Sequence, residues 1–244
     1  MRARLDLEPV GGKTTIPWNW QYFLSSAIYS TFEQSDPQLA NYLHRSKEIK
    51  LYTFSQIRAP NRNPTDKGLT VFDEAELIFS TAKDLIMKTG VEGALVKGRL
   101  RVKDAEFRIK SVEMMEQPDF SKAADEYIKG KTLSPVNTST KRKKEGKLKQ
   151  WDLYPDDIQF YENIRKNLLK KYEKIHGEKP EDRFLDLKIN RFDNKRVNIR
   201  DTHHRASHFN FNIKGSPKLI ETAYQCGLGE KNSMGFGCIQ FNDI

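Results

Sequence analysis

A glycine-rich stretch near the end of the chain has the composition of an anion-binding loop. It covers residues 227–237 and holds two Gly-x-Gly pairs on either side of a short polar, basic segment. Glycine lets a backbone approach a ligand closely and adopt positive φ without steric cost, and successive N–H groups of such a loop can form a nest for an anion. We therefore expect the loop to contact the phosphate backbone of a nucleic acid. The residues expected to take part are Gly227, Gly229, Lys231, Asn232, Ser233, Gly235 and Gly237.

Known nucleotide-binding glycine loops differ from this one in their surroundings. A dinucleotide fingerprint needs G-x-G-x-x-G between a strand and a helix, whereas here five residues separate the pairs and a strand is expected after Gly237. A Walker loop needs Gly-Lys-Ser/Thr, which this stretch lacks. A tight β-hairpin without a ligand is the remaining alternative, and the two pairs flanking Lys231 make it the less favoured one.

The chain carries an excess of positive charge, part of which is concentrated in one segment. Lys plus Arg number 42 against 33 Asp plus Glu, so the 244 residues have a formal net charge of +9. Such an excess favours polyanions as partners. Lys141–Lys149 contains six cations opposed only by Glu145, and we expect Lys141, Arg142 and Lys143 to contact a nucleic-acid backbone. A solvated loop is the alternative for this segment taken alone.

Composition and cysteine content indicate a protein of the reducing cytoplasm. No apolar run is long enough to span a membrane, and the first residues carry charges without an apolar signal core. We therefore expect a cytoplasmic protein with free thiols, no membrane association and no cofactor. Cys226 and Cys238 lie on either side of the glycine-rich stretch, and the sequence leaves open whether they pair.

Hydrophobic periodicity divides the chain into two similar halves. Alternating apolar residues predict strands, and an apolar stripe at helical spacing after Pro17 predicts a helix. With an extra helix and a hairpin of the first half set aside, each half has the order β-α-β-β-α-β, the ferredoxin-like arrangement shared with RNA-recognition (RRM-like) domains. We expect an α+β protein with two tandem ferredoxin-like domains, at residues 1–117 and 131–244, joined by a linker at 118–130.

The individual elements follow from the same patterns. In the first half we expect a helix from Pro17, helices at Pro37–Leu43 and Lys83–Val96, and strands at Arg2–Glu8, Lys50–Ile57, Leu69–Phe72, Glu76–Thr81 and Ala105–Met115. In the second half we expect helices at Pro155–Ile175 and Ser216–Gln225, and strands at Lys131–Thr138, Phe184–Phe192, Arg196–Arg200, His208–Ile213 and Gly237–Phe241. The basic segment between Thr138 and Pro155 is expected to form a loop.

A histidine-rich segment, residues 203–208, is a second place with potential for chemistry. On a strand, His204 and His208 share one face, and we expect them either to contact RNA or to lie on an exposed polar face. Zinc is disfavoured because no recognised ligand spacing is present. The acidic pair Asp156-Asp157 is typical of the first turn of a helix, so a two-metal nuclease is disfavoured and no metal site is expected.

The glycine-rich stretch closely resembles the C-terminal loop of the repeat-associated (RAMP) superfamily. Residues 20–29 and 39–44 extend the resemblance, which is greatest to the CRISPR-associated family-six endoribonucleases that process precursor CRISPR RNA. The resemblance implies metal-independent cleavage within a CRISPR repeat: the ribose 2′-hydroxyl attacks the adjacent phosphate and leaves a 2′,3′-cyclic phosphate and a 5′-hydroxyl. It also implies single-stranded or hairpinned repeat RNA as the partner, further contacts with proteins of a CRISPR interference complex, and a monomer or homodimer.

Three residues match the positions that perform the chemistry in archaeal members of this family. They are Tyr29 on the first helix, His44 after the second and Lys50 nearby. Histidine suits either proton transfer of the reaction, and a lysine ammonium can stabilise the charge that builds on the phosphate. Tyr29 is expected to orient the nucleophile or to donate a hydrogen bond. The assignment of acid and base is left open, and Lys47 is close enough in sequence to substitute for Lys50.

Two functions without catalysis share much of this pattern. A RAMP-type subunit that binds guide RNA in an interference complex without cutting it would need the same fold and loop, and the three matched residues favour the enzyme instead. A general basic RNA-binding protein fits the charge and the fold but leaves the detailed loop unexplained. Taken separately, the three residues also fit a half-buried helix tyrosine, a helix C-terminal cap and an ordinary strand lysine.

Overall fold

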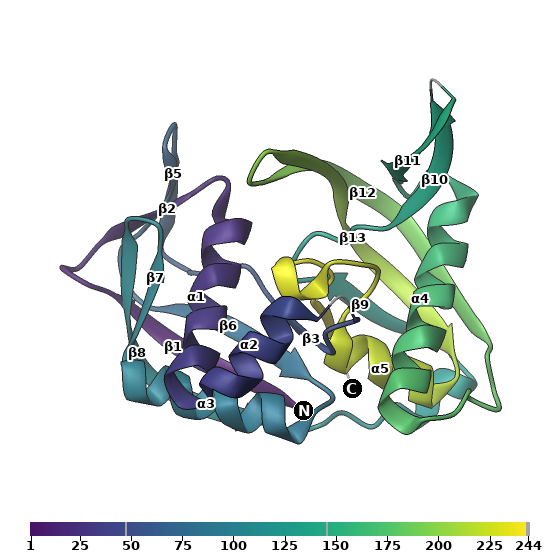
Figure 1. Cartoon of the computed structure of the whole chain (residues 1–244), viewed down its shortest axis with the longest axis horizontal. Coiled ribbons are helices and arrows are strands. Elements are labelled where there is room, and N and C mark those ends of the chain that lie inside the picture. The colour runs from purple at the N-terminus through teal and green to yellow at the C-terminus, as the bar shows by residue number, and fades with distance from the viewer. Residues whose placement is uncertain (47, 145, 243–244) are drawn as a thin grey trace.

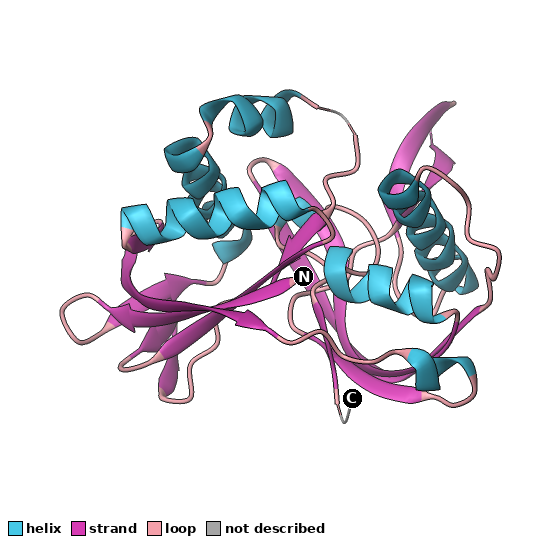
Figure 2. Cartoon of the chain, turned by 90° about the horizontal axis from the view of Figure 1, so that it is seen from below, coloured by secondary structure: helices cyan, strands magenta, loops and turns pink. Residues whose placement is uncertain are grey.

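The computed structural model describes residues 1–46, 48–144 and 146–242, which form two α+β halves side by side (Figure 1). The first half is built on a five-stranded antiparallel sheet in the order β3-β6-β1-β8-β7. Its strands are β1 (Arg2–Pro9), β3 (Tyr52–Phe54), β6 (Ala75–Thr81), β7 (Arg99–Val102) and β8 (Ala105–Met115). Helices α1 (Trp20–Ser35) and α3 (Asp84–Lys97) cover one face of this sheet and enclose a core that includes Phe32, Leu77 and Phe107 (Figure 2).

The second half is built on a four-stranded antiparallel sheet in the order β12-β13-β9-β14. Its strands are β9 (Ile128–Thr132), β12 (Leu185–Ile199), β13 (Thr202–Gly215) and β14 (Ile239–Phe241). Helices α4 (Ile158–His176) and α5 (Pro217–Cys226) lie on one face, over a core that includes Phe160, Ile164 and Phe211. A 3-10 helix, η1 (Ser121–Ala124), lies between the two sheets in the sequence.

Smaller elements extend from both halves. Helix α2 (Pro37–Arg45) follows α1, and β2 (Thr14–Pro17), β5 (Gly68–Val71) and β4 (Arg62–Thr65) form a three-stranded sheet in that order. Strands β10 (Ser139–Lys144) and β11 (Lys147–Asp152) form a hairpin that projects from the second half (Figure 1). A short 3-10 helix, η2 (Asn232–Met234), lies within the glycine-rich stretch.

The sharp connection between α1 and α2 depends on Asp36. Its backbone N–H donates to the carbonyl of Phe32 at the end of α1 (2.7 Å), and its carboxylate accepts hydrogen bonds from the N–H groups of Gln38 and Leu39 in the first turn of α2. Pro37 occupies the first turn, where its missing N–H leaves nothing unsatisfied. One residue thus ends one helix and begins the next, so that α2 folds back against α1.

Cross-strand partners extend the sheet of the second half beyond the sequence prediction. The strands expected at Arg196–Arg200 and His208–Ile213 are parts of the long β12–β13 hairpin, in which even charged residues are paired, such as Arg196 with Arg205. The strand expected at Lys131–Thr138 lies earlier in the chain, at Ile128–Thr132, because Ile128 pairs with Ile213 on β13. Residues 133–138 form only isolated bridges, at Val136 and Asn137. Strand propensity depends on such neighbours, and they are distant in the sequence.

Two other segments also differ from expectation. The basic segment expected as a loop is the β10–β11 hairpin, which turns at Gly146 with a positive φ of 76°. Helix α1 begins at Trp20 and not at Pro17, because residues 14–17 pair with β5 instead. In both cases pairing with another strand prevails over the local pattern.

Buried polar contacts join the two halves. Arg2 on β1 is 2% exposed; its guanidinium lies 3.5 Å from the centroid of the Tyr224 ring on α5 and donates to the Tyr224 carbonyl (2.7 Å). Ser80 on β6 donates to the same carbonyl (2.9 Å). These contacts connect the first sheet directly to α5 of the second half.

The structure answers the question, left open by the sequence, of whether the two cysteines pair. Cys226 and Cys238 are both unpaired and buried, and burial raises the pKa of each thiol to about 11. Within the residues that the structure describes, no helix is long and apolar enough to cross a membrane.

Candidate functional site

Tyr29 and His44 lie in contact where α2 packs against α1. Their ring centroids are 5.5 Å apart with an angle of 57° between the planes. His44 is exposed in the last turn of α2. The Tyr29 hydroxyl donates to the carbonyl of Ala40 on α2 (2.7 Å), and burial, followed by the charge of Glu33, raises the pKa of this phenol. The phenol therefore keeps its proton and uses it in a structural hydrogen bond, while the imidazole of His44 is accessible.

Lys50 lies on another side of α2. It lines a mostly apolar cavity of about 230 Å³ together with Leu43 and Lys174, and His44 is not part of this lining. Lys50 is half-buried, and this burial lowers the pKa of its ammonium group. The structure thus brings Tyr29 and His44 together, whereas Lys50 faces a neighbouring cavity. Lys47, the alternative to Lys50, lies outside the described residues.

The glycine-rich stretch contacts the first half through strand β3, which follows Lys50. The hydroxyl of Thr53 donates to the Phe236 carbonyl (2.9 Å), and Ser233 shares a hydrogen bond with the buried hydroxyl of Tyr52. Burial raises the pKa of Tyr52, and the nearby phenol of Tyr29 acts in the same direction. The loop therefore lies against β3 close to Tyr29. Neither Tyr52 nor Thr53 carries a spacing signal that would predict this contact.

The four glycines of the Gly-x-Gly pairs are buried and have positive φ. A Cβ on Gly229 would lie 2.2 Å from the carbonyl oxygen of Asn137, and one on Gly237 would lie 2.0 Å from that of Leu228. A Cβ on Gly235 would lie 3.0 Å from the ring of Phe54. At these positions the space that a side chain would need is filled by the protein itself. Glycine is required here by the packing of the loop between the two halves.

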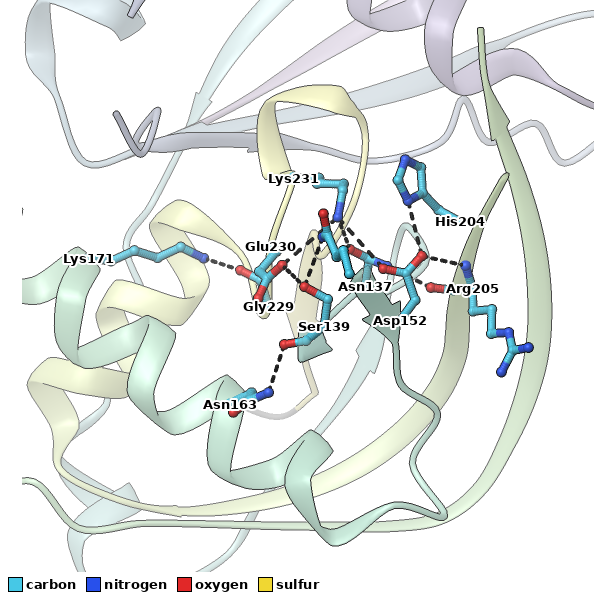
Figure 3. Close-up of polar contacts among 11 residues, drawn as sticks. Asn137, Ser139, Asp152, Asn163, Lys171, His204, Arg205, Gly229, Glu230 and Lys231 are labelled. Atoms are coloured by element: carbon cyan, nitrogen blue, oxygen red, sulfur yellow. Dashed lines mark hydrogen bonds and ion pairs between the residues drawn. The ribbon is translucent and has the colours of Figure 1, made fainter. Parts of the chain in front are cut away.

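Lys231 and Asn232, two of the predicted RNA-binding residues, make contacts within the protein. Lys231 is 18% exposed; its ammonium donates to Asn137 Oδ1 (2.8 Å) and lies 3.9 Å from a carboxylate oxygen of Asp152 (Figure 3). The Asn232 amide donates to the carbonyls of Leu228 and Phe236 across the loop. These contacts fix the conformation of the loop and balance most of the charge of Lys231.

His204 is oriented by a carboxylate. Its Nδ1 lies 3.1 Å from Asp152 Oδ2, which also accepts a hydrogen bond from the Arg205 N–H (3.1 Å; Figure 3). Burial raises the pKa of Asp152, but the hydrogen bond with His204 and the charge of Lys231 prevail and lower it. An ionised Asp152 is thus the centre of a cluster that joins β11, β13 and the loop. The cluster could not be predicted from the sequence, because its residues stand far apart, at positions 152, 204 and 231.

His208 lies in a different environment on the same strand. Its Nδ1 lies 2.9 Å from the hydroxyl of Thr132, and burial lowers its pKa to about 4, so the ring is neutral at physiological pH. It lines a cleft of about 390 Å³ between the two halves, whose wall also contains Trp18, Lys195 and Arg196. The two histidines predicted to share one face are therefore bonded to different parts of the protein.

The basic segment is displayed on the projecting hairpin. Lys141, Arg142 and Lys143 are exposed on β10. Arg142 donates to the carboxylate of Asp157 (2.8 Å) and lies 5.3 Å from the ring centroid of Trp151, so part of its charge is used within the protein. No group of three or more His, Cys, Asp or Glu side chains suited to a metal ion occurs in residues 1–46, 48–144 and 146–242.

The fold and this geometry define a class: two-domain α+β proteins in which a C-terminal glycine-rich loop packs against the first domain. Two family models match the chain, CRISPR-associated protein Cas6, N-terminal, at residues 15–113 and CRISPR associated protein Cas6, C-terminal, at residues 115–241. The CRISPR-associated endoribonuclease Cas6 1 of Methanocaldococcus jannaschii is 36% identical, over 98% of this chain and 92% of its own length. This chain therefore belongs to the Cas6 family of CRISPR-associated endoribonucleases.

Solved structures agree with this assignment. One described as CRISPR associated protein Cas6 has a TM-score of 0.87 at 35% identity and covers 100% of this chain and 99% of its own. Another, described as a RAMP protein binding different RNA substrates, has a TM-score of 0.88 at 26% identity and covers 100% of both chains. The family resemblance predicted from the glycine-rich stretch and the N-terminal residues is thus confirmed.

Proposed function

We propose that this chain cleaves precursor CRISPR RNA within its repeats, without a divalent metal. In this reaction the ribose 2′-oxygen forms a bond to the adjacent phosphorus and the bond to the 5′-oxygen breaks, which leaves a 2′,3′-cyclic phosphate and a 5′-hydroxyl. The observation that carries the proposal is the contact between Tyr29 and the exposed imidazole of His44, next to the strand on which the glycine-rich loop lies. Two of the residues matched to the family's catalytic positions in the sequence are thus also neighbours in space.

The roles follow from the environment of each side chain. His44 transfers a proton, either from the 2′-hydroxyl or to the leaving 5′-oxygen, because its imidazole is exposed and an imidazole suits proton transfer near neutral pH. Tyr29 holds the ring of His44 in place, since its own hydroxyl is bonded to a helix carbonyl. Lys50 supplies positive charge for the oxygens of the phosphorane from the adjoining cavity.

RNA binding is proposed for the second half, on the hairpin and in the glycine-rich loop. The exposed cations Lys141, Arg142 and Lys143 of the hairpin contact the RNA backbone. In the loop, the half-buried Lys231 and Ser233 provide contacts, while the glycines and Asn232 shape the backbone that presents them. The remaining residues proposed to take part are Gly227, Gly229, Gly235, Gly237, His204 and His208.

The domain assignment is proposed on the same basis. Residues 1–117 form a ferredoxin-like domain with the catalytic residues, and residues 131–244 form a second one with the loop. The joining segment expected at 118–130 is not a free linker, because Phe120 and Ala123 pack in the core of the second half and β9 begins at Ile128. The sheet orders β3-β6-β1-β8 and β12-β13-β9-β14 support this proposal, because each places its fourth strand beside its first.

A second function has support of its own. A similar structure is described as a RAMP protein binding different RNA substrates, so a subunit that binds guide RNA within an interference complex and does not cut it is the alternative. In that case the exposed His44 would have no proton to transfer.

One experiment distinguishes the two. Repeat RNA is incubated with the protein in EDTA, beside the same RNA with a 2′-deoxy sugar just upstream of the scissile phosphate. The proposal predicts a 2′,3′-cyclic phosphate end on the first RNA and no cut in the second, although both bind. Binding of both RNAs without a cut would favour the alternative function, and full cleavage of the deoxy RNA would rule out attack by the 2′-hydroxyl.

A further inference from the structure

Lys171 is a buried lysine in the interior of α4. It is 0% exposed, and lysine is almost never fully buried unless its charge is met by specific partners. Its ammonium donates to the carbonyl of Gly227 (2.7 Å) and to that of Gly229 (2.9 Å; the second contact is drawn in Figure 3). The titratable groups that act on it are Cys226 at the end of α5 and Glu230 on the loop. Two backbone carbonyls are thus the direct partners of this cation.

These two carbonyls mark the first turn of the glycine-rich loop. Gly227 and Gly229 both have positive φ, at 80° and 68°, and the Gly227 N–H is bonded to the Ala223 carbonyl at the end of α5. One ammonium that binds carbonyls two residues apart fixes the orientation of the peptide units between them. Lys171 therefore fastens residues 227–229 to α4.

The far end of the same loop is fastened to the first half. The Phe236 carbonyl accepts the hydroxyl of Thr53, Ser233 is bonded to Tyr52, and Gly235 packs on the ring of Phe54. Strand β3, which carries all three partners, adjoins Tyr29 through Tyr52. The loop is thus anchored at one end by α4 and at the other end by the strand next to the candidate catalytic pair.

We propose that Lys171 is a positioning residue for the cleavage reaction. It keeps residues 227–229 in place so that the rest of the loop remains on β3 beside Tyr29 and His44. Lys171 itself touches neither the RNA nor the reacting atoms. This inference rests on the proposed function, because it assigns the loop a part in presenting the scissile phosphate.

The two native cysteines can be used to measure whether the loop stays in place. Its two cysteines, Cys226 and Cys238, are unpaired, 0% exposed and located directly before and after the loop. Each thiol of the native protein can react with a maleimide only when its surroundings open, so the labelling rate measures how often they open. Peptide mass spectrometry identifies which of the two cysteines is labelled. Lys171→Met keeps the length of the side chain and removes the donors. We expect it to speed the labelling of Cys226 by roughly ten- to a hundredfold, as for lost hydrogen bonds of a charged group, and that of Cys238 much less.

Leu168→Ala is the matched control. Leu168 lies one turn earlier on α4 and is fully buried in the core of the second half, so its truncation weakens the fold without removing the contacts of Lys171. Global unfolding exposes both thiols alike, so this variant should speed the labelling of Cys226 and Cys238 by similar factors. If Lys171→Met does not fold, Lys171→Gln replaces it, because the shorter amide retains donors and should show a smaller effect in the same direction.

The catalytic readout uses single-turnover cleavage at saturating protein, with binding of the 2′-deoxy RNA measured in parallel. We expect Lys171→Met to reduce the maximal rate by about tenfold or more with little change in RNA affinity, and Leu168→Ala to keep the wild-type rate where it is folded. A wild-type rate in Lys171→Met, or equal labelling of the two thiols, would overturn the positioning role. If the wild type binds but never cuts, the proposed function fails, while the labelling experiment still decides whether Lys171 holds the loop.

Discussion

Burial of Lys171 predicts a pH dependence of stability that a single substitution removes. Burial lowers the pKa of its ammonium from 10.5 to about 7, against the smaller opposing effects of Cys226 and Glu230. In the unfolded chain the group stays protonated up to about its ordinary pKa. Between these two values the unfolded state binds more protons, so the free energy of unfolding rises with pH. Below about pH 7 both states are protonated, and the cost of the buried charge is fully present.

The size of the effect follows from the same two values. The unfolded state binds more protons than the folded state over this range, and integrating that difference from pH 7 to pH 9 gives about 1.7 pH units. At 1.36 kcal/mol per unit this corresponds to ~2 kcal/mol in the free energy of unfolding. Above pH 9 the thiols of Cys226 and Cys238 act in the opposite direction, because burial raises their pKa to about 11. Both thiols are retained in Lys171→Met, so the difference between wild type and variant isolates the lysine.

The assay is urea unfolding followed by circular dichroism at pH 7, 8 and 9. Over this range the free energy of unfolding of the wild type should rise by ~2 kcal/mol more than that of Lys171→Met. The exposed neighbour Lys170 provides the control, since Lys170→Met removes the same charge from the same helix and should follow the wild type. Parallel pH curves for wild type and Lys171→Met would refute the reasoning, because they would mean that the buried ammonium keeps an ordinary pKa.

Three further predictions concern RNA binding, packing and chemistry. Replacing Lys141 and Lys143 by alanine should reduce the slope of log affinity against log salt by about 0.7 for each lost contact with single-stranded RNA; an unchanged slope in filter binding would place the RNA away from the hairpin. Gly229→Ala should lower the free energy of unfolding by roughly 2–4 kcal/mol, because backbone strain adds to the 2.2 Å clash with a carbonyl. The control Gly98→Ala, at a glycine with positive φ and open space around it, should lower it by only about 1–2 kcal/mol. Equal losses of the two variants in urea unfolding would contradict the packing role of Gly229. Tyr29→Phe removes one hydrogen bond but keeps the ring, so the single-turnover rate should fall by less than about tenfold, and a larger loss would give the phenol a direct part in the chemistry.

Much of the architecture was predictable because it depends on local patterns. The alternation over Ala105–Met115 gives the full extent of β8, and the helix expected at Lys83–Val96 differs from α3 by one residue at each end. Family membership was predictable as well, because the glycine-rich stretch has a distinctive spacing. The β10–β11 hairpin and the full length of β12 and β13 were not, because their charged residues are held in strands by pairing across the hairpin rather than by a local apolar pattern.

The environment of the loop could not be read from spacing. Asn137, Asp152 and Lys171 reach it from three different segments of the chain, and the contacts of Lys231 with the first two join residues far apart in the sequence. One signal was available: Lys171 follows Ile164 and Leu168 at helical spacing, on the face that α4 buries. A lysine within an apolar stripe predicts a buried cation, although the sequence does not identify its partners.

The central claim, that His44 carries proton transfer in metal-independent RNA cleavage, has a direct test. Single-turnover cleavage of repeat RNA is measured in EDTA for wild type, His44→Ala and His176→Ala; His176 is likewise exposed in the last turn of a helix and serves as the control. His44→Ala should lose roughly 10²–10⁴-fold in rate with RNA binding retained, and His176→Ala should match the wild type. A wild-type rate in His44→Ala would contradict the claim and make His204, already oriented by Asp152, the next candidate.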